Sequence, residues 1–196
     1  MVSGRRLGSE QSATRDMIIK AAVEVLQDEG ATKLTAARIA EKAGVKAHLV
    51  HYYFRTMEDL VTALVRTHGQ AGLKNTARAI ASDEPLRALW DLETAYKWGA
   101  AAMEFSALAS HSPTAQDELK RYIEEIRSVQ AEALARHFEL REVECPFPPL
   151  AITVIIASIA RQLVRERAVG VTLGHAEATA VVDEFLASIS KPRKPG

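Results

Sequence analysis

The sequence predicts an all-α protein of about nine helices. Three observations support this: apolar residues recur with helical spacing along most of the 196 residues, strand-like alternation is missing, and helix-capping residues stand at the ends of the periodic segments. The sequence also contains neither an Asn-Gly nor an Asp-Gly hairpin signal. We therefore expect a small N-terminal domain of three helices, followed by a larger helical domain.

The first part of the chain carries clear helix-boundary residues. Thr35 is suited to an N-cap, and Gly44 is suited to the left-handed turn that ends a helix. Thr56, with Asp59 three residues later, predicts a capping box at the start of a long helix. After a polar arm over residues 1–13, the expected helices cover about 14–29, 36–43, 46–53 and 56–80.

The rest of the chain continues as helices separated by proline and glycine. Pro85 opens one segment, and Gly99 is expected to divide it from the next. Ser112 followed by Pro113 is a cap residue with a proline at the first helical position. The expected helices begin near residues 85, 100, 113, 150 and 175, and a basic tail covers residues 191–196.

The composition is that of an ordinary soluble protein. Apolar residues make up 47% and charged residues 26%, and 25 Lys and Arg balance 25 Asp and Glu. The single cysteine, Cys145, can form neither an internal disulfide nor a multi-cysteine metal site, which favours a reducing compartment. The N-terminal residues lack the apolar run of a signal peptide, and the longest uncharged stretch, 145–160, is too short to span a bilayer. We expect a cytoplasmic protein with no metal and no other cofactor.

Two short helices joined by Ala43-Gly44-Val45 predict a helix-turn-helix over about residues 35–54. The second helix can turn one face outward, towards a DNA major groove, while Val50, Tyr53 and Phe54 pack inward. Residues 33–55 hold five basic side chains against one acidic one, a local charge of +4, whereas residues 71–190 carry −5. Because phosphate attraction supplies much of the affinity for DNA, this local charge matters more than the zero net charge.

Residues 14–65 resemble the DNA-binding domain of TetR/AcrR-type transcriptional regulators. The resemblance rests on three blocks whose spacing matches without gaps: Ile19 to Gly30, Leu34 to Val45, and Tyr52 to Leu60. It implies a homodimer that binds an inverted-repeat operator in double-stranded DNA, is released by a small-molecule effector and acts most often as a repressor. The contacts to DNA that it implies are Thr35, Lys46, Ala47, His48, His51, Tyr52 and Thr56.

The chain departs from the family pattern at three positions, two of them among these contacts and one directly after Thr56. The family often has tyrosine where His51 stands, lysine where Met57 stands and glycine where His48 stands. A histidine can still donate a hydrogen bond to a phosphate, whereas a methionine cannot. The individual contacts to the DNA backbone are therefore expected to differ from the family's usual set.

The resemblance also implies that residues 56–190 bind an effector and form the dimer. Two helical stripes fit a four-helix dimer interface, although they equally fit the core of a monomer. Their proposed interface residues are Ile155, Ile159, Gln162, Val182, Phe185 and Leu186. Large side chains on the middle helices can line a ligand pocket, although such residues are more often core. The candidates are Trp90, Trp98, Met103, Phe105 and Tyr122.

Two other classes of function compete with that of a regulator. An enzyme is disfavoured because the sequence lacks the Glu-x-x-His pairs of di-iron bundles, the His-Glu-x-x-His zinc motif, the Gly-x-Ser-x-Gly elbow and the phosphate-binding loop. The remaining alternative is a helical interaction or architectural protein that binds DNA without sequence specificity. A specific, symmetric DNA site distinguishes the regulator from both.

Overall fold

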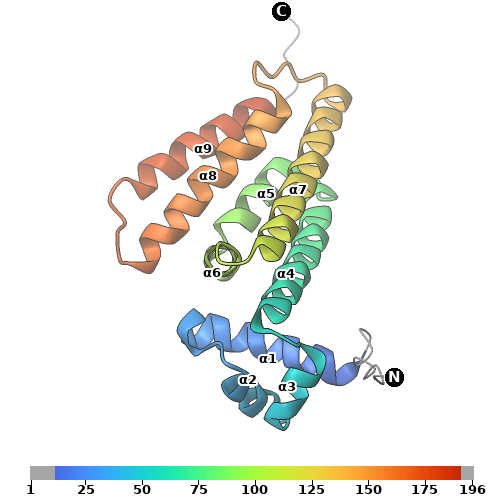
Figure 1. Cartoon of the computed structure of the whole chain (residues 1–196). Coiled ribbons are helices and arrows are strands. Elements are labelled where there is room, and N and C mark those ends of the chain that lie inside the picture. Colours follow the sequence, from blue (N-terminus) through green and yellow to red (C-terminus); the bar gives the residue numbers. More distant parts are fainter. Residues whose placement is uncertain (1–11, 191–196) are drawn as a thin grey trace, which may run out of the picture. The chain divides into compact units, whose positions relative to one another are not determined.

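The computed structural model describes residues 12–190, apart from the side chains of residues 96–102 and Ser190. Within this range the chain forms nine α-helices, one short 3-10 helix and no strand, which confirms the all-α prediction (Figure 1). Most of the predicted polar arm and the whole basic tail lie outside the described residues. The helices are α1 (Ala13–Glu29), η1 (Ala31–Lys33), α2 (Ala36–Ala43), α3 (Ala47–Tyr53), α4 (Met57–Ile80), α5 (Pro85–Thr94), α6 (Tyr96–Ala109), α7 (Pro113–Leu140), α8 (Pro149–Ala168) and α9 (His175–Ser190).

The predicted caps begin the helices that they were expected to begin. The side chain of Thr35 accepts a hydrogen bond from the backbone N–H of Arg38. Thr56 and Asp59 form the reciprocal pair of a capping box, because each side chain accepts from the other residue's backbone N–H at 3.0 Å. The division expected at Gly99 is wrong: helix α5 already ends at Thr94, because Ala95 adopts an extended conformation.

The helices form two compact units, each built from two separate stretches of chain. One unit contains the residues up to His68 together with Met103–Lys120. The other contains Gly69–Ala102 together with the residues from Arg121 onward. Helices α4, α6 and α7 therefore each contribute residues to both units.

The N-terminal unit is organised around α1, which packs against α2, while α2 packs against α3. Its interior contains Ile18, Leu26, Ile39, Val50 and Leu60, none of them more than 1% exposed. Burying an aliphatic side chain of this size contributes about 1.5–3 kcal/mol. These contacts hold the short helices α2 and α3 in place, since helices of eight and seven residues are not stable alone.

The C-terminal unit has its own core, in which α5 packs against α8 and α9. Leu86 and Trp90 of α5 meet Ile152 and Leu163 of α8 in this core. At another place in the same unit, a Cβ added to Gly69 would lie 2.9 Å from a ring carbon of Tyr122. The absence of a side chain at Gly69 thus lets the Tyr122 ring lie directly against the backbone of α4.

Candidate DNA-binding surface

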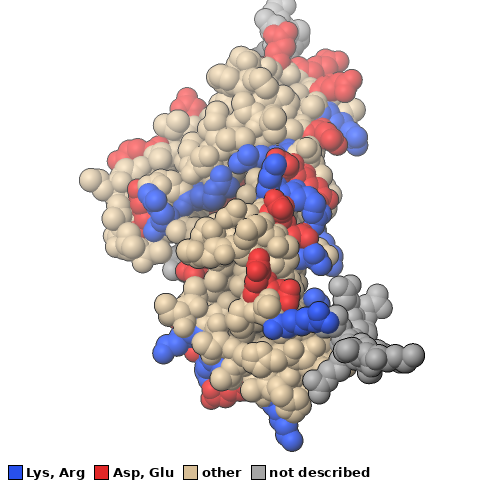
Figure 2. Space-filling view, viewed as in Figure 1, with Lys and Arg blue, Asp and Glu red and all other residues tan. Residues whose placement is uncertain are grey.

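Helix α3 presents one exposed face and one buried face. Val50 is 1% exposed and Phe54, which follows the helix, is 3% exposed, so these two side chains anchor it to the N-terminal unit. The opposite side is open, and Figure 2 shows Lys or Arg side chains at the outer end of these first helices. The exposed residues of this face are the five predicted ones, Lys46, Ala47, His48, His51 and Tyr52.

The turn between α2 and α3 depends on Gly44. Its φ of 65° and ψ of 29° lie in the left-handed region, where a side chain would be strained. The Gly44 N–H donates to the carbonyls of Ala40 and Glu41, and the Val45 N–H donates to Ala40 as well. These bonds satisfy the last carbonyls of α2 and fix the direction in which α3 leaves the turn.

Two further contacts fasten α3 to the first helix. The hydroxyls of Ser12 and Tyr53 lie 2.8 Å apart, and the guanidinium carbon of Arg15 lies 5.1 Å from the centre of the Phe54 ring. Tyr52 meets Tyr53 edge-on, with ring centres 5.1 Å apart. The exposed Tyr52 is therefore oriented by a neighbour that is itself held by α1.

Thr35 and Thr56 stand at the N-termini of α2 and α4, and both are exposed. Each hydroxyl already accepts a backbone hydrogen bond as a cap, so it can still donate its own proton to an acceptor such as a phosphate oxygen. The first N–H groups of a helix also favour an anion. Both predicted positions are thus free to contact a DNA backbone.

The basic charge of this region is smaller than the sequence count indicated. The guanidinium of Arg38 donates three hydrogen bonds to the Glu29 carboxylate, at 2.8–3.1 Å, and also pairs with Glu41 at 2.7 Å. The hydrogen bond from Arg38 is the main reason why the pKa of Glu29 lies below its ordinary value. Lys42 lies 3.4 Å from Asp28 and 3.8 Å from Glu24.

Two of the five counted cations are therefore neutralised by carboxylates, most of them on α1. Lys33, Lys46 and Arg55 have no such ion pair within residues 12–190. The sequence count missed this pairing because the acidic partners lie 9 to 18 positions earlier in the chain and reach α2 only through the packing of the two helices.

The candidate ligand residues do not fall within one unit. Phe105 is 1% exposed and Met103 is partly buried, and both belong to the N-terminal unit. Trp90, which is 2% exposed, and the partly buried Tyr122 belong to the C-terminal unit. The side chain of Trp98 lies outside the described residues. Trp90 is a core residue, packed among apolar side chains of α5, α8 and α9.

A partly buried polar cluster in the C-terminal unit was not predicted from the sequence. Burial raises the pKa of the Glu93 carboxyl, while Arg161 and a hydrogen bond from Gln130 act in the opposite direction. Gln130 is only 4% exposed. Burial, together with the charge of Glu93, also raises the pKa of the Tyr122 phenol. Buried groups with shifted pKa values are candidates for ligand contact, but their approach from three helices is invisible in the sequence.

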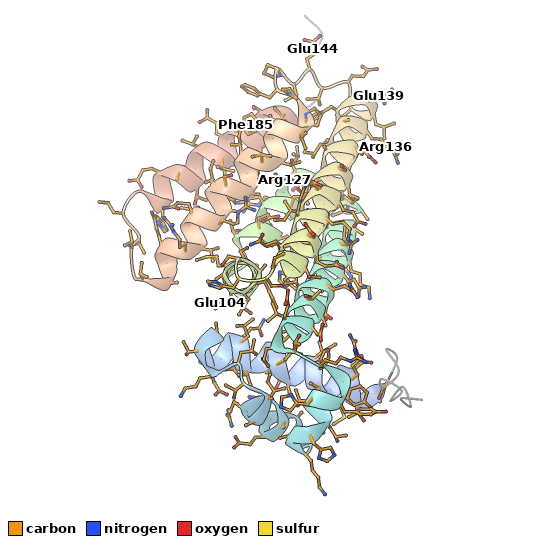
Figure 3. The ribbon with its side chains drawn as sticks, viewed as in Figure 1. Glu104, Arg127, Arg136, Glu139, Glu144 and Phe185 are labelled. Carbon is orange, nitrogen blue, oxygen red and sulfur yellow. The ribbon has the colours of Figure 1, made fainter. Side chains whose placement is uncertain are left out.

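The predicted dimer residues divide between open and buried positions. Ile155 is 53% exposed, Gln162 is exposed, and Ile159 is partly exposed. Phe185, marked on α9 in Figure 3, is also partly exposed and lies 6.1 Å from the ring of Phe147.

Val182 and Leu186, the other two residues predicted for the interface, are not exposed on the subunit. They are 5% and 4% exposed, because they already pack into the core of their own unit. Val181, which is 67% exposed, is the apolar residue that α9 leaves open at this point.

Within residues 12–190, no group of three or more histidine, cysteine, aspartate or glutamate side chains is arranged to hold a metal ion. In the same range, every helix is too short or too polar to cross a bilayer.

Residues 18–64 match the family model described as bacterial regulatory proteins, tetR family. Over 139 residues the chain is 29% identical to an uncharacterized HTH-type transcriptional regulator in the dhlA 5′ region of Xanthobacter autotrophicus; this match covers 65% of the chain and 69% of that relative. The reduced form of NemR from E. coli has a similar fold, with a TM-score of 0.74 and 15% identity over 92% of this chain and 100% of that one. A TetR transcription regulator from Haloarcula marismortui gives a TM-score of 0.72 and 19% identity, over 90% and 97% of the two chains.

Proposed function

We propose that this chain is a TetR-family transcriptional regulator, and that it is a cytoplasmic repressor that binds an inverted-repeat operator as a homodimer and is released by a small-molecule effector. The observation that carries the proposal is the outer face of α3. Its five predicted contact residues are all exposed, while the other side of the helix is anchored by Val50 and Phe54. An α-helix held in this way is suited to enter a major groove.

Lys46 is the N-cap of α3 and His48 lies in its first turn, so they are placed to reach base edges first. His51 and Tyr52, one turn later, are suited to the flanking phosphates, as are the exposed helix starts at Thr35 and Thr56. With Arg38 and Lys42 paired to carboxylates, few cations remain for phosphate contact. We therefore expect weak binding of one subunit to DNA and tight binding only when two subunits engage one site.

The open face of α8 supports a homodimer. Ile155, Ser158 and Gln162 follow one another at intervals of three and four residues and are all exposed, so they form one continuous stripe. Val181 on α9 adds apolar surface. A twofold dimer would match the symmetry of an inverted repeat, whose half-sites lie about 34–36 Å apart along the DNA.

Release by an effector requires that the ligand bind the DNA-free state better than the DNA-bound state. The buried Gln130 and the partly buried Glu93 and Tyr122 in the C-terminal unit are the best candidates for the contact. Helix α4 runs without a break from Met57 to Ile80, and its residues belong to both units. A displacement of its second half would therefore be transmitted to the helix-turn-helix and would change the separation of the two α3 helices.

The decisive experiment is selection of genomic DNA fragments by the purified full-length protein. Fragments that share a symmetric site, with two half-sites one helical turn apart, are the expected result. Lys46→Ala and His51→Ala variants should bind that site more weakly, whereas Lys20→Ala, which alters an exposed residue of α1, serves as the matched control. Fragments without a shared symmetric sequence would instead favour the architectural, non-specific alternative.

A further inference from the structure

A cleft of about 490 Å³ lies within the N-terminal unit, away from the outer face of α3. Its walls come from the first turn of α1, the end of α3, one face of α4 and the start of α7. This volume is in the range of sites for small molecules or parts of larger ones. The walls are polar and include three arginines, Arg15, Arg55 and Arg66.

Several of the charged groups in the cleft already have partners. The Glu58 carboxylate accepts a hydrogen bond of 2.7 Å from Ser112, and the Asp59 carboxylate accepts one from the backbone N–H of Thr56. Arg66 donates two hydrogen bonds to one carboxylate oxygen of Glu118, at 2.6 and 3.2 Å. These groups are engaged in holding the unit together, so they are poor candidates for binding a ligand.

Three groups of the cleft are uncommitted, in the sense that their side chains form no ion pair or hydrogen bond within the described part of the chain. Arg55 is exposed and has no ion pair or hydrogen bond there. Arg15 lies against the ring of Phe54 and pairs with no carboxylate of residues 12–190. Thr62, which is 9% exposed, has a hydroxyl that is buried and lacks a hydrogen-bond partner. A buried hydroxyl without a partner is unfavourable and normally has a reason.

We propose that this cleft binds an oxyanion of the phosphate type through Arg15, Arg55 and the hydroxyl of Thr62. The uncommitted groups are two cations and one hydroxyl, which together match an acceptor-rich anion. Arginine is also the side chain best suited to such groups, because its planar fork of N–H donors matches their oxygens. The site lies outside the proposed effector site and adds to the seven predicted DNA contacts, since none of its three residues belongs to either set.

The phosphate group can come from a free small molecule or from the DNA backbone. Arg55 directly follows the end of α3 and precedes the start of α4, so it is near the proposed DNA contacts Tyr52 and Thr56 in sequence. The carboxylates of Glu58 and Asp59 also line the cleft and repel an anion. We therefore expect modest affinity for phosphate alone, in the millimolar range.

The first arm of the test is a calorimetric titration of the full-length protein with inorganic phosphate, without DNA and at constant ionic strength. If the site binds free phosphate, the titration should saturate. The affinity should then fall at least tenfold in Arg55→Gln and several-fold in Thr62→Val. Lys20→Gln, a change of equal charge at an exposed position of α1, should leave it unaltered. Arg55 is exposed, so its replacement keeps the fold even if Arg15→Gln does not.

The second arm measures binding to a non-specific 20-base-pair duplex at several salt concentrations, so it needs no operator. If the backbone supplies the phosphate, Arg55→Gln lowers the slope of log K against log salt by about 0.9 and Lys20→Gln does not. A slope that stays unchanged while free phosphate binding is lost identifies a small-molecule ligand. If Arg55→Gln alters neither quantity more than Lys20→Gln does, the site does not exist, whether or not the protein proves to bind a symmetric operator.

Discussion

His68 makes the stability of the N-terminal unit depend on pH. It is 8% exposed in α4, its ring lies 4.3 Å from that of Phe105, and burial lowers its pKa to about 4. In the unfolded chain a histidine has a pKa of about 6.5, so between these two values the unfolded chain binds the proton and the folded chain does not. The contribution is fully present above pH 6.5 and is lost as the pH falls.

The size of this effect follows from the two pKa values. When the pH falls from 7.5 to 5.0, protonation of His68 in the unfolded chain should lower the free energy of unfolding by about 2 kcal/mol, because each pKa unit corresponds to about 1.4 kcal/mol. The change His68→Phe keeps an aromatic ring against Phe105 and removes the proton. We therefore expect the variant to lose about 2 kcal/mol less than the wild type over this range.

The assay is urea unfolding followed by circular dichroism at pH 7.5, 6.0 and 5.0, at one protein concentration so that association does not change the result. His111→Gln is the matched control, since His111 is exposed and follows α6. Equal loss of stability on acidification in the wild type and in His68→Phe would refute the reasoning, whatever their absolute stabilities.

Three further predictions concern other parts of the chain. Lys46→Gln should lower the slope of log K against log salt, for binding to duplex DNA, by about 0.9. Lys42→Gln should change that slope by less than half as much, because Lys42 pairs with two carboxylates. Filter binding at several salt concentrations compares the two variants. Ser112→Ala should lower the free energy of unfolding in urea by about 1–2 kcal/mol, because it removes a buried helix cap and a hydrogen bond to a carboxylate. Val181→Asp should sediment as a monomer with an unchanged circular dichroism spectrum. Leu140→Asp, at a leucine that is even more exposed, should remain a dimer, and a dimeric Val181→Asp would contradict the proposed interface.

The helix-turn-helix was predictable because its signals are local. Thr35, Gly44 and the Thr56–Asp59 pair each define a helix end through hydrogen bonds to residues three or four positions away. Helical spacing likewise separated Val50, which is buried, from the exposed residues of α3. A short stretch of sequence is therefore enough to predict the ends of these helices and the two faces of α3.

The features that escaped prediction depend on packing between distant segments. The pairing of Arg38 with Glu29, the burial of Val182 and Leu186, and the approach of Gln130 to Glu93 all require knowledge of which helix faces meet. Apolar spacing shows that a residue faces an interior, but it does not distinguish the interior of the subunit from an interface. The cleft around Thr62 belongs to the same class, since four helices contribute to its walls.

The division of the N-terminal unit into two stretches of chain has a consequence for its synthesis. The ribosome releases residues up to His68 well before Met103–Lys120, which complete the same unit. Ser112 and Glu118, the partners of Glu58 and Arg66, emerge about 50 residues after the groups that they bind. The N-terminal unit therefore reaches its full stability only after α5, α6 and the start of α7 have been translated. A gene fragment that stops at the end of α4 should yield a protein whose α4 is frayed and prone to proteolysis. Exchanging the N-terminal unit between two such regulators therefore requires grafting two segments of chain rather than one.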